Sequence, residues 1–204
     1  MTKKILLTLV IVLTAVAGAS AQFRYGPVVG VDLTSLHFKQ DLFEVNQAPG
    51  ATAGIMAEMI FPGIGFGIDF GLNYQTRGAK LHLDQREMWA SQGYGSPRLW
   101  LHYLEIPLHL RFKWTRMNGL EDTFAPFVFG GPSFGFLLGH SKLPAMEYAG
   151  GDVGLTAGIG IELFRHWQIM ASYTWGVTYA LKAAVLTNMS AQNRTWDLRV
   201  CYLF

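Results

Sequence analysis

The chain has 204 residues, 23 of them glycine, and it is 50% hydrophobic, 14% aromatic and only 15% charged. This composition excludes an intrinsically disordered protein, which needs low hydrophobicity and high charge. A formal net charge of +2 lacks the basic excess of a nucleic-acid-binding protein. The single cysteine excludes an internal disulfide framework and a cysteine-rich zinc site. The length allows one domain of moderate size, and we expect no cofactor.

The first 21 residues have the pattern of a secretory signal peptide. Lys3 and Lys4 precede a mostly apolar stretch from Ile5 to Val16, and the small residues Ala19-Ser20-Ala21 follow. This order is that of a charged region, an apolar region of about 12 residues and an A-x-A cleavage site. A membrane anchor is the alternative, but a helical span needs roughly 20 apolar residues. We therefore expect a signal peptide over residues 1–21 and a mature domain over residues 22–204.

Beyond residue 21, apolar and polar residues alternate with a period of two, which is typical of β-strands. The clearest stretch is Trp100–Trp114, in which apolar side chains share one face except at His102, and charged side chains share the other. The same separation recurs over residues 66–77, 152–163, 167–177 and 195–204, and more weakly over 24–35, 51–60 and 124–138. The sequence therefore predicts eight strands.

Short and long connections alternate between the predicted strands. The short ones are residues 61–64, 115–122 and 165–166, and the long, more polar ones are residues 37–50, 78–99, 139–151 and 178–193. Short turns at one end and long loops at the other are typical of membrane β-barrels with periplasmic turns and extracellular loops. An even number of strands places both termini at the end with the short turns.

Aromatic residues near both ends of the strands decide between two kinds of barrel. A soluble, ligand-binding cup has an apolar lining and a polar exterior, whereas a membrane barrel carries an apolar outer band bordered by two aromatic girdles. The predicted girdles comprise Phe66, Tyr74, Trp100, Trp114, Trp167, Trp175, Trp196 and Tyr202. We therefore expect an all-β fold, an eight-stranded antiparallel up-and-down transmembrane β-barrel in the cell outer membrane.

Charged residues in the middle of the predicted strands all fall on the face opposite the apolar band. They are Glu58, Asp69, Glu105, Arg111, Lys113, Glu162, Asp197 and Arg199. On the lipid face near the midplane, an arginine or lysine would cost about 2–4 kcal/mol. The side chains of an eight-stranded barrel largely fill its interior, so the pattern predicts an ion-pair network that plugs the lumen. A narrow conduction path lined by the same charges is the alternative.

Several motifs resemble the PorT-like outer-membrane β-barrel family. They are residues 103–108 (YLEIPL), 126–138 (PFVFGGPSFGFLL), 157–163 (AGIGIEL) and 173–178 (YTWGVT). The terminal residues 201–204 (CYLF) resemble the aromatic signal, here Phe204, that the barrel-assembly machinery reads in outer-membrane proteins. The resemblance implies a small Gram-negative outer-membrane barrel of eight antiparallel strands. It also implies a connection to protein secretion or surface assembly, although most members have no assigned activity.

The sequence offers little that resembles a catalytic or metal site. The histidines are His37, His82, His102, His109, His140 and His166, and none has the spacing of metal ligands. Some eight-stranded barrels modify lipids with a serine and histidine pair, for which His102 with Ser172 or Ser190 would be the candidates. No G-x-S-x-G elbow is present, so we expect a non-enzymatic protein.

The long connection over residues 78–99 combines aromatic, methionine and arginine side chains, which are frequent in protein interfaces. Packing over the barrel mouth is the alternative role. The sequence therefore predicts a structural or interaction protein that acts through its extracellular loops. The alternatives are a lipid-modifying barrel enzyme and a small solute pore. The expected partners are outer-membrane lipid, the barrel-assembly machinery and a protein at the extracellular loops, with no nucleic acid.

Overall fold

The structure of the chain is a computed structural model. It describes residues 22–38, 44–61, 63, 65–82, 98–117, 119–141, 146–183 and 190–204. The predicted signal peptide lies outside the described residues, as does most of the predicted loop over residues 78–99. Among the described residues, no helix is both long enough and apolar enough to cross a membrane.

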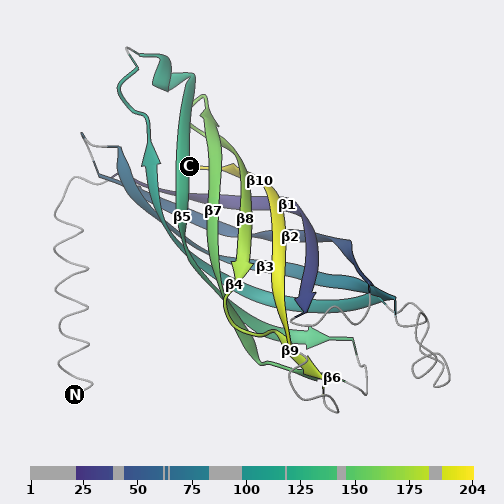
Figure 1. Cartoon of the computed structure of the whole chain (residues 1–204). Coiled ribbons are helices and arrows are strands. Elements are labelled where there is room, and N and C mark those ends of the chain that lie inside the picture. Colours follow the sequence, from purple (N-terminus) through teal and green to yellow (C-terminus); the bar gives the residue numbers. More distant parts are fainter. Residues whose placement is uncertain are drawn as a thin grey trace, which may run out of the picture.

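The described chain forms a closed barrel (Figure 1). Its wall consists of β1 (Gln22–Phe38), β2 (Glu44–Ile60), β3 (Phe66–His82), β4 (Arg98–Lys113), β5 (Phe124–His140), β7 (Gly151–Leu163), β8 (Trp167–Gly176) and β10 (Ser190–Tyr202). Each strand pairs antiparallel with the next, and β1 pairs antiparallel with β10 to close the wall. The predicted eight-stranded antiparallel up-and-down barrel is therefore confirmed.

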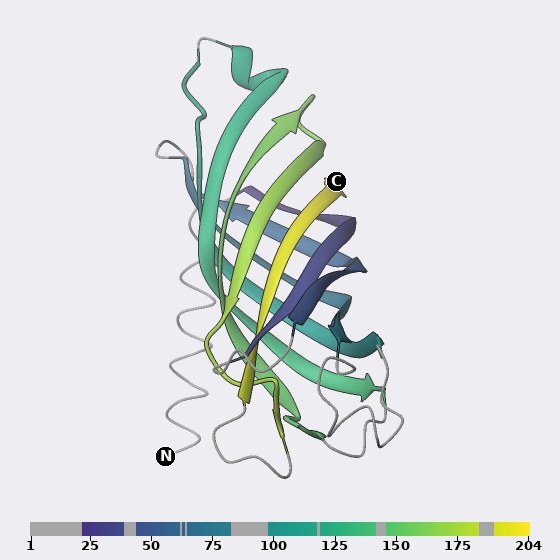
Figure 2. The ribbon, with the colours of Figure 1, turned by 45° about the vertical axis from the view of Figure 1, so that its right-hand side comes forward.

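Three short elements lie outside the wall. They are the 3-10 helix η1 (Leu120–Asp122) and the strands β6 (Met146–Tyr148) and β9 (Leu181–Ala183). Strand β9 pairs with the start of β10, and β6 pairs with β9, so the sheet continues past the barrel rim. Figures 1 and 2 show η1 at one end of the barrel, here called the turn end, and β6 and β9 at the opposite, loop end.

The strands extend further at the loop end than the sequence predicts. The predicted loop over residues 37–50 is mostly strand, because β1 continues to Phe38 and β2 already begins at Glu44. A strand needs only about 9–11 residues to cross the hydrocarbon layer, whereas β1 has 17. The hydrophobic alternation ends where the strand leaves the lipid, but the backbone ladder continues because it needs no apolar side chains.

Neighbouring residues on each strand face opposite sides of the wall. Val31, Leu110 and Ile159 lie on the outer face and are 63%, 70% and 65% exposed. Their chain neighbours Asp32 and Arg111 face inward and are 2% and 1% exposed. A soluble cup would show the reverse arrangement, so the structure favours the membrane barrel over the cup.

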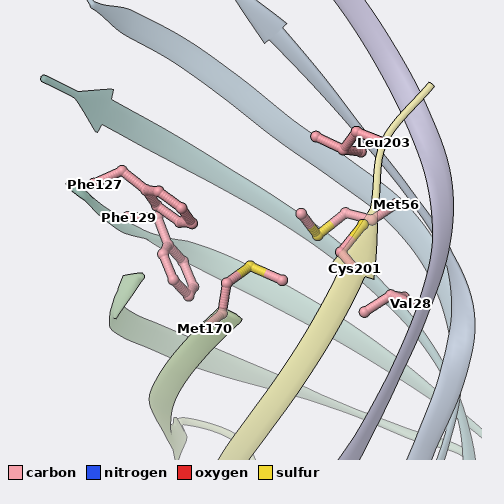
Figure 3. Close-up of a cluster of buried hydrophobic side chains, with 7 residues drawn as sticks. All are labelled: Val28, Met56, Phe127, Phe129, Met170, Cys201 and Leu203. Carbon is pink, nitrogen blue, oxygen red and sulfur yellow. The ribbon is translucent and has the colours of Figure 1, made fainter. Parts of the chain in front are cut away.

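A small apolar cluster packs inside the barrel near the turn end (Figure 3). It consists of Val28, Met56, Phe127, Phe129, Met170, Cys201 and Leu203. Figure 3 shows the two phenylalanines and Met170 on one side and the other four residues on the other. The cluster lies beside charged residues of the interior, because Phe127 and Phe129 are the cross-strand partners of Lys113 and Arg111.

Candidate functional site

The turn-end half of the interior contains a charged network with a single hub. This turn-end cluster comprises Arg24, Glu58, Asp69, Arg111, Lys113, Glu162 and Gln168. The hub is Glu58 on β2, which is 0% exposed. Its Oε2 accepts hydrogen bonds from Arg111 Nη1 at 2.5 Å and Gln168 Nε2 at 2.7 Å. Its Oε1 accepts from Arg24 Nε at 2.9 Å and Lys113 Nζ at 3.1 Å.

The cations of the turn-end cluster each bind a second carboxylate. Arg111 Nε donates to Asp69 Oδ2 at 2.8 Å, and both Lys113 Nζ and Arg24 Nη2 donate to Glu162 Oε2 at 2.6 Å. Three cations therefore face three carboxylates, so the desolvation of each ion is offset by close opposite charges.

Local sequence allows Arg111 to reach the hub. Its cross-strand neighbour on β3 is Gly67, which has no side chain to block the path from β4 to Glu58 on β2. The guanidinium also lies over the Phe127 ring, 3.9 Å from its centroid. Such a cation–π contact stabilises a cation that has left water.

A second network, the central cluster, lies further toward the loop end. It comprises Asp32, Gln75, Arg77, Glu105, Asp152, Asn193, Asp197 and Arg199. Arg77 forms ion pairs with Glu105 and, at 3.2 Å, with Asp152. Arg199 Nη2 binds Glu105 Oε1 at 3.0 Å and Asp197 Oδ1 at 3.1 Å. These pairs connect β3, β4, β7 and β10 across the interior.

The central cluster contains more acids than bases. Four carboxyl groups, those of Asp32, Glu105, Asp152 and Asp197, face two guanidinium groups. Asp32 and Asp197 are direct cross-strand partners at the β1–β10 seam and are 2% and 4% exposed. Among the described residues, Asp32 Oδ1 and Asp197 Oδ2 have no hydrogen-bond partner. Like charges directly opposite each other destabilise a strand pair.

An Asp32→Asn variant is therefore expected to be more stable than the wild type, by about 0.5–1 kcal/mol. The amide oxygen can still accept the hydrogen bond that Thr52 Oγ1 donates to Asp32 Oδ2 at 2.7 Å. Urea unfolding of the refolded protein measures the change. Asp152→Asn is the control and is expected to lose stability, because Asp152 binds Arg77 and accepts from Asn193 Nδ2 at 2.6 Å. Equal losses in both variants would contradict the expectation.

Neutral polar side chains line the wall between β4 and β8. His109 Nε2 lies 3.2 Å from Ser133 Oγ, which is 2.8 Å from Thr156 Oγ1, and Thr156 is in turn 2.8 Å from Thr174 Oγ1. The His109 ring also stacks on Phe129, with centroids 5.5 Å apart. This hydroxyl chain satisfies buried polar groups without adding charge.

The structure places all eight charged residues named in the sequence analysis on the inner face and divides them between the two clusters. Four further charged residues of the clusters were missed, namely Arg24, Asp32, Arg77 and Asp152. The alternation of polar and apolar residues could have found them, because each of the four lies on the polar face of its strand. Three of them lie near the ends of the predicted strands, whereas the sequence pattern assigns only mid-strand charges to the interior.

The predicted girdle residues lie on the outer face. Phe66, Trp114, Trp167 and Tyr202 are near the turn end, and Tyr74, Trp100, Trp175 and Trp196 are nearer the loop end. Several rings touch, for example Trp167 with Tyr202 at 4.9 Å between centroids. The two groups therefore border the apolar band on both sides.

The serine and histidine pairs considered for catalysis do not assemble. His102 lies on the outer face, where its Nδ1 is 2.7 Å from the Tyr74 hydroxyl. Ser172 is buried on the inner face, and Ser190 is buried at the start of β10. In the part of the chain that the structure describes, no group of three or more histidine, cysteine or acidic side chains could hold a metal ion.

The last two residues form backbone hydrogen bonds to the chain on both sides of β10. Phe204 N donates to Tyr25 O at 2.9 Å, and Leu203 N donates to His166 O at 2.8 Å. The Phe204 ring is 66% exposed on the outer face and contacts Tyr202, with centroids 5.1 Å apart. The terminal aromatic ring is thus presented outward, beside the closing strand pair.

A closed barrel with an apolar, aromatic-bordered outer face and a paired charged interior has the architecture of an outer-membrane β-barrel protein. Residues 18–181 match the family model of the outer membrane protein beta-barrel domain. The chain belongs to this family, and its location is the outer membrane. No curated protein matches the chain.

Solved structures with the same architecture include three outer-membrane proteins. OprG from Pseudomonas aeruginosa is 12% identical, with 89% of this chain and 94% of OprG covered and a TM-score of 0.53. Ail of Yersinia pestis is 14% identical, with coverages of 90% and 99% and a TM-score of 0.45. The outer membrane enzyme PagL is 9% identical, with coverages of 83% and 97% and a TM-score of 0.39. At such identities the likeness to OprG shows the fold alone.

Proposed function

We propose that this protein is a non-enzymatic outer-membrane barrel with a plugged lumen that binds a protein partner at its loop end, through the long connection between β3 and β4. The observation that carries the proposal is the pairing of inward charges across the lumen. Arg24 on β1 binds Glu162 on β7, and Arg199 on β10 binds Glu105 on β4. Ion pairs that cross the interior occupy the space that a solute would need.

The loop end supports an interaction role. The backbone ladder continues beyond the rim through β9 and β6, with Ala180 N donating to Ala191 O and Ala149 N to Ala180 O, both at 2.9 Å. Tyr148 stacks on His140 with centroids 3.8 Å apart and donates to Ser141 O at 2.8 Å. These contacts hold part of the loop end in a fixed arrangement that a partner could recognise without a large ordering cost.

The resemblance to PorT-like proteins supports a partner in secretion or surface assembly. The resembling motifs include residues 103–108 on β4, where Tyr103 and Glu105 face the central cluster. A barrel that anchors a surface assembly needs a stable wall and exposed loops, and it needs neither a catalytic pair nor an open lumen.

The test replaces residues 84–96 with a glycine-serine linker of equal length in the expressed full-length protein. Crosslinking in living cells is expected to give discrete complexes for the wild type and none for the linker variant. Heat-modifiability on a detergent gel is the control, and both proteins are expected to show the same mobility shift of a closed barrel.

Two results would contradict the proposal. Complexes that persist in the linker variant would exclude the connection between β3 and β4 as the binding element. Stepwise conductance of the wild type in planar bilayers would show an open pore and exclude the plugged lumen.

A further inference from the structure

The described side chains on the outer face at the loop end include bases but no acids. The basic side chains described there are His37, Lys80, His102, His140 and Arg194. Every acidic side chain that the structure describes lies either in the barrel interior or in the turn-end connection, as Glu121 and Asp122 do. The five residues form a band that we call the basic collar. No acidic side chain that the structure describes lies beside it.

Arg194 differs in this respect from the interior arginines. Arg77 and Arg199 each bind two carboxylates, whereas Arg194 has no ion pair among the described residues. The side chain is only half-buried, and its cross-strand neighbours are Trp175 and Ser35. A guanidinium without an internal anion is free to bind an external one, and its planar donors suit phosphate oxygens.

A pocket of about 320 Å³ lies beside Arg194. It is lined by His37, Tyr179, Ser190, Gln192 and Arg194. His37 and Gln192 are cross-strand partners at the β1–β10 seam, and Gln192 Nε2 donates to Val177 O at 3.2 Å. The lining therefore combines two basic groups with hydroxyl and amide groups, all of which can donate hydrogen bonds to an oxyanion.

The position of the pocket along the strands indicates where an anion bound in it would come from. Trp196 is the next outward residue on β10 after Arg194, and Trp175 is the cross-strand neighbour. Girdle tryptophans lie at the level of the lipid headgroups, so Arg194 faces the headgroup layer of the outer leaflet. Basic pockets at this level bind anionic headgroups.

We propose that this pocket binds a phosphate group of an outer-leaflet glycolipid and that the rest of the basic collar attracts such lipids to the wall. The site lies on the outside of the barrel, apart from the interior clusters and from residues 84–96, the segment that the crosslinking test replaces. It positions the barrel among lipids and involves no chemical step.

Native mass spectrometry of the folded, detergent-solubilised full-length protein tests the proposal with bis-phosphorylated lipid A as the probe. The wild type is expected to bind it about tenfold more tightly than dephosphorylated lipid A, since a charge-assisted hydrogen bond is lost with the phosphate. The double variant His37→Gln/Arg194→Gln is expected to lose this preference.

Arg165→Gln is the matched control. It removes an exposed arginine at the turn end, where Arg165 pairs with Asp122, and it is expected to leave lipid binding unchanged. A heat-induced mobility shift confirms that each variant is folded. Equal binding of both lipids, or equal loss in Arg165→Gln, would overturn the proposal. Binding of millimolar inorganic phosphate with the same dependence on Arg194, but not of lipid A, would assign the pocket to a soluble anion and also overturn it.

Discussion

A Glu58→Gln variant is expected to lose about 3–5 kcal/mol of folding free energy, because removing one member of a buried ion-pair network leaves its partners uncompensated. Glu58 is fully buried and binds Arg24, Arg111 and Lys113. With a neutral amide in its place, three cations would share two carboxylates. Urea titration of the refolded protein, followed by the gel mobility of the closed barrel, measures the loss.

Two further variants test whether the loss of stability in Glu58→Gln comes from the charge balance of the turn-end cluster. Asp122→Asn removes the exposed partner of Arg165, and it is expected to change stability by at most about 1 kcal/mol. Adding Lys113→Met to Glu58→Gln removes one excess cation and is expected to restore part of the loss. A Glu58→Gln protein as stable as Asp122→Asn would show that the network does not hold the wall together.

We expect the barrel of a Gly26→Ala variant to close poorly or not at all at the seam between β1 and β10. A Cβ atom at Gly26 would lie 1.7 Å from the Tyr202 carbonyl oxygen and 3.2 Å from Leu203 Cα, both backbone atoms at the β1–β10 seam. A side chain cannot rotate away from this clash, so the strands would have to separate where they close the barrel. Overpacking typically costs about 1–3 kcal/mol of folding free energy. Because the clash at Gly26 involves backbone atoms at the seam, we expect Gly26→Ala to cost about 3 kcal/mol or more.

Gly139→Ala is the matched control for the seam. The nearest atom to a Cβ at Gly139 is His102 Cδ2 at 3.9 Å, which is an ordinary contact. Outer-membrane fractions are expected to show the heat-modifiable band for Gly139→Ala and a weak or missing band for Gly26→Ala. A normal band for Gly26→Ala would mean that the seam can relax, and the close approach of β1 to β10 would then be dispensable.

The alternation of residues is sufficient to assign side chains to the two faces but not to pair them. The period of two between residues 100 and 114 places Arg111 and Lys113 inside the barrel, as found. It cannot show that Arg111 meets Glu58, because that contact joins strands that are not adjacent and depends on the register of β3 between them. Register and strand tilt follow from closure of the whole wall.

The extension at the loop end illustrates a second limit. Strands β6 and β9 have three residues each, too few for a period of two to be recognised, and they lie in polar connections. Strand β9 forms because the start of β10 offers backbone groups beyond the rim, and β6 then pairs with β9. Pairing of this kind is determined by the neighbouring backbone and leaves almost no signal in hydropathy.

The ion pairs that cross the interior also determine how the chain can fold. Arg24 binds Glu162, and Arg199 binds Glu105, so the pairs join strands that are distant both in sequence and around the wall. A partly assembled sheet lacks these partners, and its charged face would lie uncompensated in the hydrocarbon layer. Intermediates are therefore high in free energy, and contacts of long sequence separation form slowly. We therefore expect insertion into the bilayer and closure of the seam to occur as one cooperative event.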